Sequence, residues 1–252
     1  MSAVIAVATW LTDGRNWHGV EGIPHRLAEH VTISAISVGV AVALALPVAL
    51  TLGHLRRGGL VAIGLSNAAR AVPSLALLVL SALVFGLDSN VPIVIAMVAL
   101  AVPPIMTNAY VAVTDVAPGV VEAARGMGLS GWQVLARVEF PLALPMVMGA
   151  IRTAAVQVVA TETLAAALAQ GGLGRFILDG LSQNDVGKLV GGAVLVALLA
   201  VLTEAVFALA QRIVSPLDRA HRTDARSRRG MSGLPGVPET DHMEPVRPGI
   251  EM

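Results

Sequence analysis

The feature that most restricts how this chain can fold is a series of long apolar stretches separated by short polar segments. A hydrocarbon core about 30 Å thick is crossed by about 20 apolar residues in a helix, and a helix satisfies its backbone hydrogen bonds within the segment. The sequence therefore predicts an all-α, polytopic membrane protein with about five transmembrane helices. The predicted spans cover residues 30–52, 60–85, 91–113, 141–170 and 186–214.

Composition agrees with a membrane protein and argues against several other classes. Hydrophobic residues make up 55% of the chain and charged residues only 13%, and the formal net charge is zero, so nothing indicates nucleic acid as a partner. The absence of cysteine excludes disulfide frameworks and thiolate metal sites. The histidines lie outside the centres of the spans and show no metal-ligand spacing, so we expect neither a metal site nor a membrane enzyme.

The loops between the spans predict the orientation of the chain. The first span ends in the basic sequence His54-Leu55-Arg56-Arg57, which the positive-inside rule places in the cytoplasm. The loop at 86–90 has no basic residue, which suits the opposite side of the membrane. We therefore expect the N-terminus to lie outside and the C-terminus to lie in the cytoplasm.

Three regions are predicted along the chain. Residues 1–25 form an extracytoplasmic N-terminal segment, in which Trp10 and Trp17 fit either the aromatic belt of a membrane surface or a loose tail. Residues 26–216 contain the transmembrane domain. Residues 217–252 are rich in proline, glycine and charge, so we expect a disordered cytoplasmic tail.

A polar segment between the third and fourth spans is predicted to form an elbow of two short helices. Pro118 suits the first turn of a helix, and Gly128 suits the position that follows its end. Ser130 and Gln133 have the spacing of a capping box, which starts a second helix. Trp132 gives this second helix a bulky apolar side chain.

The spacing within this elbow resembles the EAA loop of ABC-importer permeases. The family pattern is matched by Glu122-Ala123-Ala124, by Gly128, and by Val138 and Phe140-Pro141, where Val replaces the usual Ile and Phe the usual Leu. In that family the loop is a coupling helix that docks on a separate ATPase subunit. The resemblance covers about residues 26–216 and implies a transport subunit of a bacterial inner membrane.

Further strings resemble the branch of this family that imports quaternary amines such as glycine betaine, choline and carnitine. The resemblance implies an importer with two permease chains, which are identical or mixed, two ATPase subunits and an extracytoplasmic substrate-binding protein. Methionine-like amino-acid importers share the fold and a similar elbow, so they remain an alternative. The strings lie at 72–77, 118–128, 151–154, 163–166 and 171–174.

The resemblance implies a role in ATPase coupling for a set of elbow residues. Glu122 would offer a charged contact, and Arg125 would pair with Glu122 or with the partner. The two glycines would allow close approach of backbones. An amphipathic hairpin without this role is the alternative. The set is Glu122, Ala123, Ala124, Arg125, Gly126, Gly128 and Trp132.

ATP hydrolysis is not expected in this chain. The only lysine is Lys188, and the sequence around it is not a phosphate-binding loop. We therefore expect no cofactor here, with Mg-ATP bound on the partner subunit. We likewise expect ligand selectivity to reside in the binding protein, because quaternary amines are held by aromatic cages and only 3% of this chain is aromatic.

Polar residues within the predicted spans are candidates for a translocation path. A charge at mid-membrane depth is costly unless it faces protein, water or a partner, so Arg70 is either a path residue or a helix-pairing arginine. Glu162 either meets a cationic substrate or pairs with Arg175 or Lys188. The uncharged candidates could equally form interhelical hydrogen bonds. The candidates are Asn67, Arg70, Ser74, Asn108, Gln157 and Glu162.

The predicted mechanism is alternating access, in which closure of the ATPase subunits moves the elbow and the spans attached to it. The competing prediction is an ion-coupled secondary carrier that uses Arg70 and Glu162 as a mid-membrane relay. Five spans and the elbow between the third and fourth count against the carrier.

Overall fold

The fold is described from a computed structural model, which covers residues 3–59, 63–64, 67–68, 71–168 and 171–214. The regular structure of these residues is helical, and no strand occurs among them. The predicted all-α membrane fold is therefore confirmed. Predictions that concern Arg70 or residues 217–252 lie outside the described residues. Four described helical segments are long and apolar enough to cross a membrane, namely Ile23–His54, Val91–Thr114, Gly131–Leu168 and Val186–Ile213.

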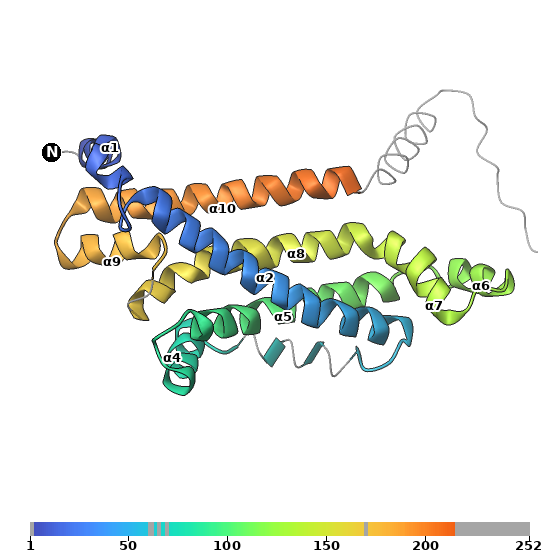
Figure 1. Ribbon diagram of the computed structural model, residues 1–252. Coiled ribbons are helices and arrows are strands. Elements are labelled where there is room, and N and C mark those ends of the chain that lie inside the picture. The colour runs from blue at the N-terminus through green and yellow to red at the C-terminus, as the bar shows by residue number, and fades with distance from the viewer. Residues whose placement is uncertain (1–2, 60–62, 65–66, 69–70, 169–170, 215–252) are drawn as a thin grey trace, which may run out of the picture. The chain divides into compact units, whose positions relative to one another are not determined.

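Three long helices, α2 (Ile23–His54), α5 (Val91–Thr114) and α8 (Phe140–Glu162), pack against one another at the centre of the bundle (Figure 1). Ala41 and Ala45 of α2 are fully buried in their contact with α5 and α8. Small side chains at i and i+4 let helix backbones approach closely, which is how membrane helices commonly associate. The core is therefore built on tight helix packing.

The last long helix, α10 (Val186–Val214), packs on α8, on the short helix α9 (Gly174–Ser182) and on α1 (Ala3–Thr12). The Trp10 ring of α1 lies edge-to-face on Phe176 of α9, with 5.2 Å between the ring centroids. Trp10 is buried, so it is a packing residue and belongs to neither a loose tail nor an exposed aromatic belt. The predicted bounds of the last span are confirmed.

The predicted continuous helix over 60–85 is wrong at its middle. Residues 71–73 are not helical, and α4 begins only after them, at Ser74–Phe85. Pro73 is extended, with φ −61° and ψ 130°. Proline lacks the N–H donor of a helix interior and disfavours helix at the residue before it, so α4 begins after Pro73. A helix of this length advances about 18 Å, too little to cross a bilayer alone. The count of five spans stays a prediction.

The fourth span also differs from its prediction. The short helix α7 (Gly131–Val134) continues through the π-helical turn η2 (Leu135–Glu139) into α8, and the 3-10 helix η3 (Thr163–Leu168) follows. Pro141 lies in the first turn of α8, and its ring would collide with the carbonyl four residues earlier in a regular helix. The wider π turn gives that ring room. The elbow is thus continuous with α8.

Candidate functional site

The elbow, residues 118–134, lies between α5 and α8 and begins with α6 (Pro118–Gly126). The predicted start at Pro118 is confirmed, and Met127 caps its end. Val121 and Ala124 face inward and pack with Val116 and Val134. Ala124 is therefore a packing residue, whereas the neighbouring coupling candidates of α6 are exposed: Glu122, Ala123, Arg125 and Gly126.

Gly128 owes its place to backbone conformation. Its φ is +87°, a region that L side chains rarely adopt, so glycine ends the helix here without strain. A Cβ built on Gly128 or Gly126 meets no atom of the described residues within 4 Å. Neither glycine is approached closely by the described residues, so the close approach predicted for docking stays a prediction.

The second helix of the elbow begins as predicted. The Gln133 side chain accepts a hydrogen bond from the Ser130 backbone N–H at 2.8 Å, and the Gln133 N–H donates to the Ser130 hydroxyl at 3.4 Å. This capping box stabilises the start of α7. Two large apolar side chains near it point away from the protein. Met127 is 75% exposed and Trp132 is 74% exposed.

A polar pocket of about 390 Å³ separates α6 from the end of α2. Glu122 and Arg125 both line it, and neither has an ion-pair partner within the described part of the chain. The predicted pairing of Arg125 with Glu122 is therefore not made here, and both charges are available to a partner. The lining residues are His54, Leu55, Arg56, Pro118, Val121, Glu122 and Arg125.

Two hydrogen bonds link the end of the first long helix, α2, and the residues after it to the segments on either side of the elbow. Nδ1 of His54 lies 2.5 Å from Oε2 of Glu139, which belongs to the π turn and is only 2% exposed. Nη2 of Arg56 donates to the Val116 carbonyl at 3.2 Å. Glu139 is not among the residues predicted from the sequence, because its partner His54 is distant in the chain and no local pattern indicates the pair.

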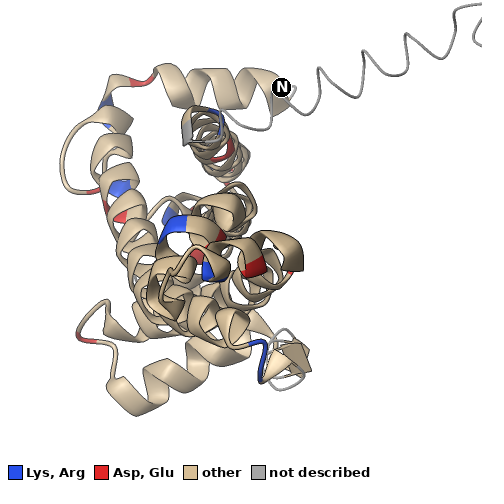
Figure 2. Ribbon diagram, turned by 90° about the vertical axis from the view of Figure 1, so that its right-hand side faces the viewer, with Lys and Arg blue, Asp and Glu red and all other residues tan. Residues whose placement is uncertain are grey.

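In Figure 2 the elbow end of the bundle faces the viewer, and basic and acidic residues lie scattered among mostly uncharged ones. An ion pair joins α8 to α10, where Nε of Arg152 on α8 is 3.4 Å from Oε1 of Glu204 on α10. Gln211 of α10 donates to the Pro145 carbonyl at 2.8 Å. These polar contacts hold α10 on α8.

The predicted path residues do not form one cluster. Asn67 is exposed in a short helical segment, and Ser74 is half-buried at the start of α4. The Asn108 amide donates to the Pro104 carbonyl at 2.7 Å, so it is engaged within its own helix. Arg70 lies outside the described residues.

Gln157 lies on an exposed face of α8. The exposed residues recur at helical spacing, and the middle of the face carries the polar side chains Thr153 and Gln157. Polar side chains within a span favour contact with protein or water over lipid. This α8 face is formed by the exposed residues Leu142, Met146, Thr153, Gln157 and Ala160.

Glu162 does not share that face. Its carboxylate accepts a hydrogen bond from the Ser34 hydroxyl, and its Oε2 lies 3.5 Å from Nε2 of His30; all three side chains are buried. The predicted pairing with Arg175 or Lys188 is wrong, because both of those residues contact Asp179 instead, at 3.0 Å and 3.4 Å.

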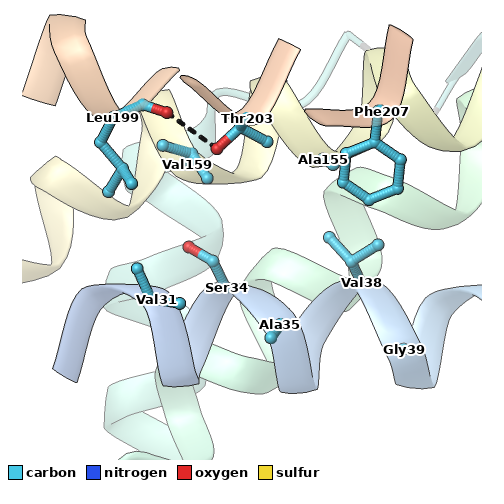
Figure 3. A pocket seen from close by; sticks show the side chains of 10 residues that line it. All are labelled: Val31, Ser34, Ala35, Val38, Gly39, Ala155, Val159, Leu199, Thr203 and Phe207. Carbon is cyan, nitrogen blue, oxygen red and sulfur yellow. Dashed lines mark hydrogen bonds between the residues drawn. The ribbon is translucent and has the colours of Figure 1, made fainter. Parts of the chain in front are cut away.

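An apolar groove of about 340 Å³ lies beside this cluster, between α2, α8 and α10 (Figure 3). The two hydroxyls in its wall are already engaged, since Ser34 donates to Glu162 and Thr203 donates to the Leu199 carbonyl at 2.8 Å. The groove therefore offers no free hydroxyl donor to a polar ligand.

Residues 37–217 match the family described as "Binding-protein-dependent transport system inner membrane component". The chain is 34% identical to the glycine betaine/carnitine/choline transport system permease protein OpuCB of Bacillus subtilis, over 76% of this chain and 88% of that protein. It is 32% identical to the osmoprotectant import permease protein OsmW of Salmonella typhimurium, over 75% and 89%.

The fold is shared with a solved transporter. A chain of the MetNI methionine ABC transporter, solved in inward-facing conformations, superposes with a TM-score of 0.65. The alignment covers 74% of this chain and 93% of that chain at 22% identity. At this level the likeness concerns the fold alone.

Proposed function

This chain belongs to the binding-protein-dependent transport system inner membrane components, and from that premise we propose that it is the permease subunit of an ATP-driven importer of osmoprotectants. The proposed substrates are quaternary amines of the glycine betaine, choline and carnitine type. The observation that supports this class is the similarity, over most of both chains, to permeases named for these compounds. Four apolar helices support a multi-pass membrane protein.

The proposed orientation places the elbow in the cytoplasm of a bacterial cell with the N-terminus outside the inner membrane. The basic residues that end the first span, Arg56 and Arg57, are at the same end of the bundle as the elbow, since Arg56 contacts Val116 beside α6. The positive-inside rule favours the cytoplasm for that end.

We assign the elbow the role of docking on a separate ATPase subunit, which would bind Mg-ATP. Two exposed apolar side chains, Met127 and Trp132, lie with the unpaired charges of Glu122 and Arg125 on this part of the chain. Large apolar groups with a few charges around them are typical of protein contact sites. The elbow therefore has the chemistry of a docking surface.

Motion of the elbow would reach three spans. A short connection joins α6 to α5, and α7 runs through the π turn into α8. The contact between His54 and Glu139 also connects the end of α2 to the π turn that follows the elbow. In the proposed mechanism, ATPase closure displaces the elbow, and α2, α5 and α8 move with it to open the path to the other side.

The proposed path lies between this chain and a second permease chain. The polar part of the α8 face, Thr153 and Gln157, is exposed in the single chain and would line that path. An extracytoplasmic substrate-binding protein would deliver the substrate at the end opposite the elbow. A methionine-like importer is the second candidate; the methionine transporter shares the fold, and the fold does not distinguish the two substrate classes.

Co-purification from the native membrane tests the proposal. We expect the wild-type chain to bring an ATPase subunit with it, and we expect Trp132→Glu to lose that subunit while the chain stays folded by size-exclusion chromatography. Trp17→Glu is the matched control, because it makes the same change on an exposed tryptophan of the N-terminal segment. It should retain the ATPase.

Transport by the purified assembly then separates the substrate classes. ATP-dependent uptake of glycine betaine, choline or carnitine into vesicles supports the osmoprotectant importer, whereas uptake of methionine alone supports the second candidate. A chain that transports in vesicles without ATP or a partner would contradict both and indicate an ion-coupled carrier.

A further inference from the structure

A buried polar cluster joins three segments at the end of the bundle opposite the elbow. His30 and Ser34 come from α2, Glu162 comes from the end of α8, and the turn at 171–173 leads into α9. His30 is fully buried. No part of this cluster belongs to the proposed docking surface or to the exposed α8 face.

The hydrogen bonds of His30 fix the protonation of its ring. Nε2 lies 2.9 Å from the Val159 carbonyl, and a carbonyl only accepts, so Nε2 carries a proton. Nδ1 accepts from the Leu173 backbone N–H at 3.3 Å, so Nδ1 carries none. The imidazole is therefore neutral, with both nitrogens satisfied, and the second bond holds the turn to α2.

The surrounding contacts draw the same turn onto α2. The Gly172 backbone N–H donates to Oε2 of Glu29 at 3.0 Å, and a Cβ on Gly171 would lie only 2.3 Å from that carboxylate. Residues 171–173 thus lie directly against Glu29 and His30 of α2. A change in the charge or hydrogen bonding of either side chain therefore acts directly on this segment.

The titratable and charged groups around His30 come from two helices. Glu162 of α8 lies 3.5 Å from Nε2 of His30. On α2, Glu29 contacts Arg26 at 3.0 Å and His25 at 3.3 Å. Any dependence on pH must therefore be separated from titration of His25 and of the two carboxylates.

We propose that His30 is a positioning residue whose neutral imidazole latches the turn at 171–173 to α2, and that uptake of a proton by His30 releases the turn and α9. A proton on Nδ1 would point at the Leu173 N–H, so two donors would face each other where one hydrogen bond exists now. Nε2 would keep its hydrogen bond to the Val159 carbonyl in either state. Proton uptake thus removes the bond to the turn and leaves the contact with α8 in place.

The consequence for transport rests on the proposed function. In that topology the latch lies on the extracytoplasmic side, where the binding protein would deliver substrate, so a proton taken up by His30 would come from outside. Histidine is the side chain that titrates between neutral and mildly acidic pH. Uptake should then depend on external pH through His30.

The Trp10 ring supplies a direct reporter, because it packs on Phe176 of α9. We would replace Trp17 and Trp132 with Phe in the full chain, reconstitute it in lipid nanodiscs and follow Trp10 fluorescence from about pH 7.5 to about pH 5. The expected result is a reversible change in emission on acidification. His30→Gln should remove the change, because the amide can donate to Val159 and accept from Leu173 but does not titrate.

His25→Gln is the matched control, since it removes a titratable histidine from the same helix and leaves His30 in place. It should retain the pH-dependent change. The proposal is overturned if Trp10 emission does not respond to pH, or if His30→Gln responds as its parent does. Loss of the response in His25→Gln alone would also overturn it.

Hydrogen exchange of the unmodified chain gives an independent measurement that needs no variant. After correction for the intrinsic pH dependence of exchange, protection of residues 171–176 should fall by about tenfold at the acid end, the factor that corresponds to a hydrogen bond worth about 1.4 kcal/mol. Protection within Val91–Thr114 should not change. Equal protection of the turn at both pH values would overturn the latch whether or not the chain is an importer.

Discussion

At the residue scale, the turn at 171–174 is decided by glycines that leave no room for a side chain. A Cβ on Gly174 would lie 2.3 Å from the Thr163 carbonyl oxygen, which is backbone and cannot move aside as a flexible side chain can. Gly172 has φ +82°. These glycines let η3 and α9 approach closely enough for the turn to contact α2.

We expect Gly174→Ala to lower stability, by about 1–3 kcal/mol, the usual cost of forcing a methyl group into filled space. The matched control is Gly39→Ala on α2, where a Cβ meets no described atom within 4 Å, so the same change should be neutral or raise stability by up to about 1 kcal/mol. Thermal unfolding in detergent compares the two. Equal midpoints would show that the contact at Gly174 relaxes freely.

From the sequence alone, Glu162 could be predicted to lie within a span, but its partners could not be predicted. Glu162 was identified as an unusual acid within a span, yet its predicted partners were basic residues nearby in the chain. The true neighbours, Ser34 and His30, belong to the first span. Helix periodicity gives the face of a residue on its own helix, and it carries no information on which distant helix that face meets.

At the scale of elements, prediction succeeded where the signal is local. The elbow was predicted from Pro118, Gly128 and the capping box, and each of these acts within a few residues. The interruption before Ser74 was missed because the span was predicted from its length and overall apolar content, and these do not show that Pro73 lies outside the helix. The π turn was also missed, since its cause is a proline whose accommodation depends on the helix around it.

The contact between His54 at the end of α2 and Glu139 of the π turn η2 can be tested by substitution. His54→Ala removes the partner of Glu139, a carboxyl group that is almost fully buried, and removing one member of a buried pair costs about 3 kcal/mol. The unfolding midpoint should therefore fall. Glu139→Gln should be milder, because the amide can still accept or donate a hydrogen bond at His54.

A double substitution separates the buried carboxyl from the rest of the joint. Replacing both His54 and Glu139 with alanine leaves neither group unsatisfied, so the double variant should be more stable than His54→Ala alone. If the double variant is instead the least stable of the three, the contact contributes by filling space and the charge of Glu139 is irrelevant.

At the scale of the whole molecule, hydropathy predicted the bounds of α5 and α10 closely, and it carried no information on which helix faces would be exposed. Both α8 and α10 present exposed residues within the bilayer. The α10 face is apolar, with Leu202 60% exposed, whereas the middle of the α8 face carries Thr153 and Gln157. The Thr153 hydroxyl donates to the Gly149 carbonyl at 3.0 Å, whereas the Gln157 amide would be costly in lipid, so we expect the two faces to have different surroundings.

Cysteine labelling tests this difference, because the chain has no cysteine and each introduced thiol gives an unambiguous signal. Gln157→Cys and Leu202→Cys lie at similar depth, since Val159 and Leu199 line the same groove. A charged, water-soluble thiol reagent reacts with the thiolate, which forms only where water reaches the site. In the assembled transporter we expect labelling at position 157 to be at least about tenfold faster than at position 202, with Thr153→Cys resembling position 157. Equal and slow labelling at all three positions would place the α8 face in lipid or in a dry helix contact, and the translocation path would then have to run along another helix.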